Sequence, residues 1–158
     1  MKNIVITGSS SGFGEDAAKV FSDAGYRVWA TMRDTTERNA AVKKALESYS
    51  SKISVVEMDV KDDNSVKDAF CDIFKEIDGV DVLINNAGIM YTGITEGFSI
   101  AQAHEQMNTN YFGAIRTTQA VLPNMRKVGN GLIINVSSIA GRIAVPYFGT
   151  YCATKFAL

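Results

Sequence analysis

Short runs of aliphatic residues alternate along the chain with longer segments in which apolar residues recur at helical spacing. The runs predict strands at residues 4–6, 28–30, 53–56, 82–84 and 132–136. The spacing between them predicts helices around 17–24 and 66–74, and a long helical stretch at about 99–127 with a kink or break at Pro123. Strands that lack polar positions are covered on both faces. The pattern therefore predicts an α/β fold with a doubly wound parallel sheet, of Rossmann-like type.

Composition narrows the class of protein. The chain has 158 residues, so we predict one Rossmann-like domain over residues 1–158. A formal net charge of −1 gives no electrostatic reason to expect nucleic acid or an anionic membrane as a partner. No apolar run approaches the roughly 20 residues of a membrane-spanning helix. Cys71 and Cys152 are too few for a disulfide framework or a zinc site, so we expect no metal and predict the reducing cytoplasm as the compartment.

A glycine-rich loop follows the first predicted strand and precedes a helix. It has the letters TGSSSGFG at residues 7–14, which is a GxxxGxG spacing. Glycines at this place permit a tight turn and let a helix N-terminus approach a pyrophosphate. The loop therefore indicates a dinucleotide site, although by itself it is also compatible with a simple turn.

The end of the second predicted strand separates NADP from NAD. A carboxylate there binds the ribose 2′-hydroxyl of NAD, whereas a positive charge binds the 2′-phosphate of NADP. The acid position falls at Met32, and Arg33 follows it. Because a guanidinium matches phosphate well, we predict NADP, with NAD as the weaker candidate. In the alternative arrangement, Asp34 turns inward to bind the ribose and Arg33 is solvated.

Polar motifs also follow the third and fourth predicted strands. Asp59-Val60 is placed to hydrogen-bond an adenine amino group, with a loop or helix-capping carboxylate as the alternative. The letters NNAG follow at 85–88, and two adjacent amides need several partners when buried. We therefore expect them to tie neighbouring loops together under the cofactor. The candidate cofactor-binding residues are Gly8, Ser10, Gly12, Phe13, Gly14, Arg33, Asp59, Val60, Asn86, Ala87 and Gly88.

Tyr151 and Lys155 stand four residues apart, which places them on one face of a predicted helix. A fixed positive charge beside a phenol favours its ionised form, which suits a general acid/base near neutral pH. The spacing alone is equally typical of a solvated helix face. Its weight comes from the motifs that precede it.

Taken in order, these motifs resemble the short-chain dehydrogenases/reductases of the tyrosine-dependent branch. The resemblance rests on TGSSSGFG, Asp59-Val60, NNAG, Asn110 in NYFG, Ser138 in NVSSIAG and the letters YCATK at 151–155, and it covers essentially the whole chain. Arg33 is similar to the NADP-preferring members. The resemblance implies an oxidoreductase that transfers hydride between the nicotinamide and a small-molecule carbonyl or secondary alcohol.

The resemblance also implies four catalytic roles. Tyr151 is the general acid/base, and Lys155 supports its ionisation and binds the nicotinamide ribose. Ser138 hydrogen-bonds the substrate oxygen, and Asn110 holds a water that links Lys155 to solvent. Taken singly, Ser137-Ser138 is also typical of a turn or a helix cap, and Asn110 of a polar residue that interrupts a helix.

Other positions carry weaker signals. His104 lies in a polar helical stretch and is predicted to be solvated, and Cys152 has no partner and is interpreted as filler. Residues 90–92 and 145–148 line a substrate pocket or serve as packing. The apolar character of residues 143–148 favours an apolar substrate.

Relatives in this family continue well beyond the helix that carries Tyr151. We therefore expect an N-terminal fragment of a longer chain, truncated after that helix. We expect the helix to fray, the fifth-strand side of the sheet to be unpaired, and an isolated 158-residue chain to turn over poorly. The full-length protein is expected to be a homo-oligomer. The alternative to an enzyme is a non-catalytic dinucleotide-binding module, such as a redox sensor or scaffold.

Overall fold

Five parallel strands form one sheet in the order β3-β2-β1-β4-β5 in the computed structural model, which describes residues 1–158. β1 pairs with β2 on one side and with β4 on the other, so the strand order reverses beside β1. The predicted doubly wound parallel sheet is therefore confirmed. Ligands in such sheets bind beyond the carboxyl ends of the strands at this reversal point. The strands are β1 Asn3–Thr7, β2 Arg27–Met32, β3 Ile53–Glu57, β4 Val82–Asn85 and β5 Leu132–Asn135.

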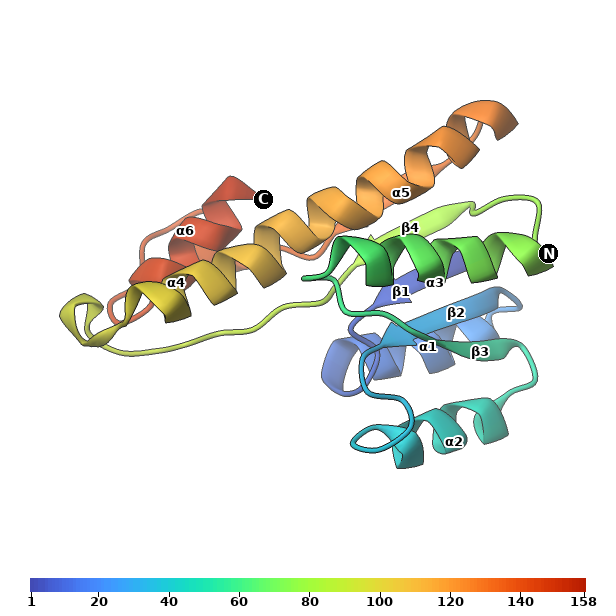
Figure 1. Cartoon of the computed structure of the whole chain (residues 1–158), viewed down its shortest axis with the longest axis horizontal. Coiled ribbons are helices and arrows are strands. Elements are labelled where there is room, and N and C mark those ends of the chain that lie inside the picture. The colour runs from blue at the N-terminus through green and yellow to red at the C-terminus, as the bar shows by residue number, and fades with distance from the viewer.

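Helices cover both faces of the sheet (Figure 1). Alternate residues of a strand point to opposite faces, and β1 fills two cores in this way. Ile4 and Ile6 pack in one core with α1 and α2, whereas Val5 packs in the other with α3 and α5. The helices are α1 Gly12–Asp23, α2 Ala40–Tyr49, α3 Asp63–Glu76, α4 Ile100–Met107, α5 Gly113–Val128 and α6 Gly149–Ala157.

The long helical stretch differs from the prediction in two ways. A π-helical turn over Asn108–Phe112 joins α4 to α5, and no break occurs at Pro123, which lies inside α5. The predicted break is wrong: Pro123 lies inside the helix, and both Pro123 and Gln119, whose carbonyl loses its helical partner, are exposed residues. Single π-turns inside helices often occur at functional sites.

The elements α4, β5 and α6 contribute no fully buried residue to the two cores. α4 and α6 lie side by side at one end of the molecule (Figure 1). β5 is an edge strand, with Leu132 53% and Ile134 39% exposed, which agrees with the expected unpaired side of the sheet. None of the helices combines the length and apolar character that a membrane crossing requires.

The central and edge strands predict very different sensitivities to the same substitution. Leu83 in β4 is 0% exposed and pairs with Ile133 of β5, next to Leu132. Leu83→Ala should lower the free energy of unfolding by about 2–5 kcal/mol, because it leaves a cavity between the sheet and α5. Leu132→Ala is the matched control and should change it by about 0.5 kcal/mol or less. Urea unfolding measures both, and equal losses would contradict this assignment of the core.

Candidate functional site

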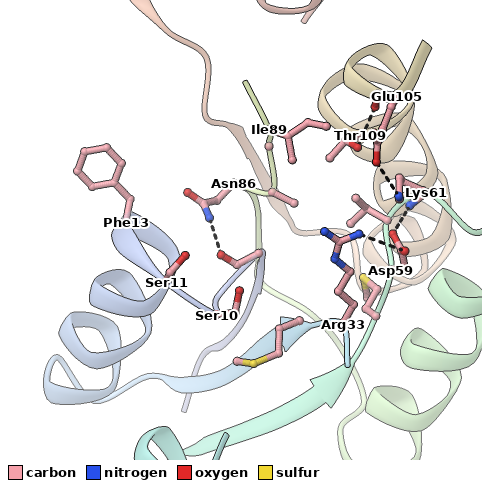
Figure 2. A pocket seen from close by; sticks show the side chains of 16 residues that line it. Ser10, Ser11, Phe13, Arg33, Asp59, Lys61, Asn86, Ile89, Glu105 and Thr109 are labelled. Carbon is pink, nitrogen blue, oxygen red and sulfur yellow. Dashed lines mark hydrogen bonds and ion pairs between the residues drawn. The ribbon is translucent and has the colours of Figure 1, made fainter. Parts of the chain in front are cut away.

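A cavity of about 280 Å³ lies beyond the carboxyl ends of the strands at the reversal point of the sheet. Most of the predicted cofactor-binding residues line it: Gly8, Ser10, Phe13, Arg33, Asp59, Val60, Asn86, Ala87 and Gly88. Gly12 and Gly14 are close in the chain but do not line it. The residues that sequence analysis did not assign to the site are Ser11, Met32, Met58, Lys61, Ile89, Glu105 and Thr109. In Figure 2, the loop after β1 and the start of α1 form one wall, and Arg33, Asp59 and Lys61 form another.

The glycine loop is shaped by two close approaches. Gly8 has a φ of +70°, and a Cβ there would lie 2.7 Å from the Cα of Ala87. A Cβ at Gly14 would lie 2.3 Å from the carbonyl oxygen of Gly8. Both distances are too short for any side chain, so these glycines are needed for contact between the loop, α1 and the end of β4. Ser11 precedes α1 without a side-chain cap, which leaves the first N–H groups of that helix available to an anion.

Asn86 ties this loop to β1, as the two adjacent amides predicted. Its Nδ2 donates to the carbonyl oxygens of Thr7 at 2.9 Å and Gly8 at 3.1 Å. In return, Thr7 Oγ1 accepts the backbone N–H groups of Asn86 at 3.1 Å and Ala87 at 3.0 Å. The neighbouring Asn85 donates to Asn135 Oδ1 at 2.9 Å, which joins β4 to β5.

Arg33, not Asp34, faces the cavity. Figure 2 shows the Arg33 side chain extending into it, and its Nη1 lies 3.9 Å from Asp59 Oδ2. The Asp34 carboxylate accepts the backbone N–H of Arg38 at 3.2 Å, so it is used within its own loop. Asp59 lines the cavity and also accepts the N–H of Lys61 at 2.9 Å, which combines its two predicted roles of site residue and loop carboxylate.

A second pair of charges borders the same cavity. Lys61 Nζ lies 3.2 Å from Glu105 Oε1, and Tyr91 Oη donates to Glu105 Oε2 at 2.7 Å. The hydrogen bond from Tyr91 lowers the pKa of Glu105, and the same bond raises the pKa of Tyr91. Glu105 comes from α4, far along the chain, and no motif in the sequence marks it. Of this charged pair, only Lys61 lies next to a motif, Asp59-Val60.

Tyr151 and Lys155 share one face of α6, as their spacing predicted. Lys155 Nζ lies 5.8 Å from the centroid of the Tyr151 ring and donates to the carbonyl oxygen of Val136 at 2.8 Å. Lys155 is only 6% exposed, and this burial lowers the pKa of its ammonium group. Tyr151 itself is half-buried and packs edge-on against Phe148.

Asn110 lies in the π-helical turn and is 1% exposed. Its side chain accepts the N–H of Ile89 at 2.8 Å and donates to the carbonyl of Ile89 at 2.9 Å. It also donates to Thr154 Oγ1 at 3.0 Å, on α6. Asn110 therefore joins the loop after β4 to the helix of Tyr151 and Lys155. A Cβ added at the cavity residue Gly88 would lie 3.3 Å from Asn110 Oδ1 and 3.8 Å from Lys155 Nζ.

The two serines after β5 have different contacts. Ser138 is the N-cap of a short 3₁₀ helix over Ile139–Gly141, and its Oγ accepts the N–H of Ala140 at 3.2 Å. The neighbouring Ser137 donates from Oγ to the carbonyl oxygen of Lys155 at 3.2 Å. One of the last-turn carbonyls of α6, which were expected to lack partners, therefore has one, and the helix packs on the 3₁₀ turn. Fraying of the helix stays a prediction.

Gln106 is a buried link that the sequence did not indicate. It is 0% exposed, accepts the N–H of Tyr91 at 3.0 Å and donates to Thr150 Oγ1 at 2.6 Å. Thr150 is next to Tyr151, so Gln106 fixes the start of α6 against the loop after β4. Gly93 N–H also donates to the carbonyl of Tyr147 at 2.9 Å, which brings together the two predicted pocket segments, 90–92 and 145–148.

The remaining titratable residues lie apart from this chemistry. His104 is exposed, as predicted, and Cys152 is buried and unpaired. Nowhere do three or more His, Cys, Asp or Glu side chains gather in a way that could hold a metal ion.

The buried ammonium predicts a specific pH dependence of stability. Because burial lowers the pKa of Lys155 in the folded state, the unfolded chain binds this proton more tightly. The unfolding free energy should therefore rise with pH between the folded pKa and the unfolded value of about 10.4. Lys155→Met removes this contribution. The unfolding free energy of the wild type should therefore rise relative to that of the variant as the pH rises through that window. Urea unfolding at several alkaline pH values measures it, and a parallel pair of curves would contradict it.

Comparison with known proteins agrees with this geometry. The family model described as short chain dehydrogenase matches residues 2–158. The chain is 41% identical over 155 residues to 3-ketodihydrosphingosine reductase of Bacteroides thetaiotaomicron, covering 98% of this chain and 54% of that protein. It is 39% identical over 160 residues to human retinol dehydrogenase 8, covering 99% of this chain and 50% of that protein. The chain thus spans about half the length of these curated relatives.

Solved structures show the same arrangement. A short-chain dehydrogenase from Streptomyces avermitilis has a TM-score of 0.92 and 34% identity, over 100% of this chain and 58% of that one. ElxO with NADP bound has a TM-score of 0.91 and 34% identity, over 99% of this chain and 63% of that one. With a family model matched across nearly every residue, the chain belongs to the short-chain dehydrogenase/reductase family of oxidoreductases.

Proposed function

We propose that the protein is an NADP-dependent oxidoreductase that transfers hydride between the nicotinamide and a carbonyl or secondary alcohol substrate. One observation carries this proposal. Gly88 lines the dinucleotide cavity, and the space next to its Cα is bordered by Asn110 and by the Lys155 ammonium. The cavity that includes Arg33 therefore extends to the Lys155 ammonium, on the helix that also carries Tyr151. A dinucleotide in this cavity would place its reactive end against a general acid/base.

The residues of the cavity fit NADP. The side chain of Arg33 is 49% exposed, and its ion pair with Asp59 is long at 3.9 Å, so its guanidinium is free to bind a 2′-phosphate. The uncapped start of α1 and the loop at Gly8 offer N–H groups to the pyrophosphate. ElxO and a gluconate 5-dehydrogenase from Burkholderia cenocepacia (29% identity, TM-score 0.87) were both solved with NADP. When bound, the cofactor would donate hydride as NADPH or accept it as NADP⁺, while the protein would supply position and proton transfer.

Three side chains would handle the proton and the substrate oxygen. Tyr151 gives a proton to the carbonyl oxygen during reduction, or takes the hydroxyl proton during oxidation. Ser138 Oγ accepts one hydrogen bond, from Ala140, so its own hydrogen is available to donate to that oxygen. Lys155 uses one N–H on Val136 and has two left for the nicotinamide ribose and for a proton path past Asn110.

The surroundings of Ser138 favour an apolar substrate. Ile139 begins the 3₁₀ turn and is 67% exposed. Ile143 and Tyr147 follow the turn in the chain and are 54% and 65% exposed. The relatives named for a 3-keto lipid base and for retinol agree with this class of substrate. Location in the cytoplasm and assembly into a homo-oligomer remain predictions from the sequence.

Arg33→Ala tests the cofactor half. It should weaken NADPH binding by about 10- to 100-fold, the value of one charge-assisted contact, and leave NADH binding unchanged. Trp29 serves as the fluorescent reporter, because it packs with Met58 and Val60, which line the cavity. Arg38→Ala, in the same loop, is the matched control and should have no effect. Tighter binding of NADH than of NADPH by the wild type would overturn the NADP assignment.

Tyr151→Phe tests the catalytic half in the full-length protein. The variant should lower kcat for NADPH-dependent carbonyl reduction by about 100-fold or more, since it removes the only proposed proton donor. NADPH binding should stay within about twofold, because the hydroxyl makes no contact that the fold needs. Tyr49→Phe, at the end of α2 and outside the cavity, is the control. A wild type that binds NADPH but reduces no carbonyl in a broad substrate screen would support the binding-module alternative.

A further inference from the structure

Glu57, the last residue of β3, holds the loop that carries Arg33. Met32 is its partner across the two strands, so the Glu57 side chain lies beside the residues that follow Met32. One carboxylate oxygen accepts the backbone N–H of Asp34 at 2.9 Å, and the other accepts the N–H of Thr35 at 3.0 Å. The Thr35 hydroxyl donates to the second oxygen as well. These bonds, those of Thr35 foremost, lower the pKa of Glu57.

The rest of the loop is fixed by its own side chains. Asp34 has a φ of +56°, in the left-handed region that Asp tolerates better than most residues. Its carboxylate accepts the N–H of Arg38 at 3.2 Å. Asn39 Nδ2 donates to the carbonyl oxygen of Arg33 at 2.7 Å. The backbone on the C-terminal side of Arg33 is therefore bound at three successive residues, and the only partner outside the loop is Glu57.

We infer that Glu57 is a positioning residue for cofactor selectivity, which acts by holding the Arg33 loop in the conformation that directs the guanidinium at the 2′-phosphate of NADP. This inference rests on the proposed function. Glu57 does not line the cavity and makes no contact with the cofactor in this scheme. Its effect passes through the N–H groups of Asp34 and Thr35. No sequence motif marks it, because a lone Glu at a strand end is ordinary.

Charge alone predicts the opposite effect. A carboxylate near a bound phosphate repels it, so neutralising Glu57 would tighten NADPH binding if electrostatics dominated. Loss of the loop anchor would weaken NADPH binding and spare NADH, which has no 2′-phosphate to place. The sign of the change in NADPH affinity therefore separates the two effects.

The experiment measures the dissociation constants of NADPH and NADH for wild type, Glu57→Gln, Thr35→Val, Thr35→Ser and Glu37→Gln. Glu57→Gln should weaken NADPH binding by about tenfold, the loss expected when hydrogen bonds to a charged acceptor are weakened, with NADH unchanged. Thr35→Val removes the hydroxyl but keeps the charge, and should weaken NADPH in the same direction. Thr35→Ser keeps the hydroxyl and should restore wild-type affinity. Glu37 lies in the same loop, and its side chain has no bonded partner. Glu37→Gln therefore removes a charge from the loop and should leave the affinity for both cofactors unchanged.

Several outcomes would overturn the inference. Tighter NADPH binding by Glu57→Gln would assign its role to charge, and an equal loss of both cofactors in the two anchor variants would assign it to general stability. Urea unfolding of each variant serves as a control that the dissociation constants are measured on folded protein. If Arg33→Ala has no effect on NADPH, the proposed NADP site itself fails. If Arg33→Ala weakens NADPH while Glu57→Gln and Thr35→Val do not, the site stands and only the role of Glu57 is rejected.

Discussion

The contact between the loop after β1 and the end of β4 is the constraint on which the rest of the site depends. These two strands are neighbours at the point where the strand order reverses. The connections that leave their ends therefore run to opposite faces of the sheet. Asn86 and Thr7 provide the contact through four hydrogen bonds to backbone groups. Gly8 and Gly14 make it sterically possible. The result is a cavity whose floor is polar backbone and whose first wall is the start of a helix.

A second set of links connects this region to α6, the helix that carries Tyr151 and Lys155. Asn110 joins Ile89 to Thr154, and Gln106 joins Tyr91 to Thr150, so the loop after β4 is bound to two turns of α6. Both side chains come from one helical stretch, and the π-turn includes Asn110. Burial of Lys155 costs solvation of its charge, and the Val136 carbonyl offsets part of that cost. These links hold the Lys155 ammonium beside the Tyr151 ring and close to the cavity residue Gly88.

The sequence motifs were informative where chemistry requires a particular residue type at a short spacing. The glycine loop, Arg33, the NNAG amides and the Tyr151–Lys155 pair all lie where their spacing predicted, because each depends on one strand end or one helix face. The predicted break at Pro123 is wrong, because local propensity does not reveal that Pro123 and Gln119 are exposed residues of α5. The expectation that the carbonyls at the end of α6 lack partners missed a contact of this kind. Ser137, distant along the chain, satisfies one of its last carbonyls.

By itself, the sequence determined the five strands, the parallel sheet, most of the helices between the strands and the residue types of the candidate dinucleotide site, since these follow from hydrophobic period and from motifs within a few residues. The helix α2 was not predicted. Only the tertiary structure decided which side chains from distant segments complete that site. Glu105 and Gln106 reach it from α4, and Glu57 reaches the Arg33 loop across a strand pair. Their positions depend on register and helix packing, which bring together residues 15 to 44 positions apart, and no local pattern in the chain encodes such contacts.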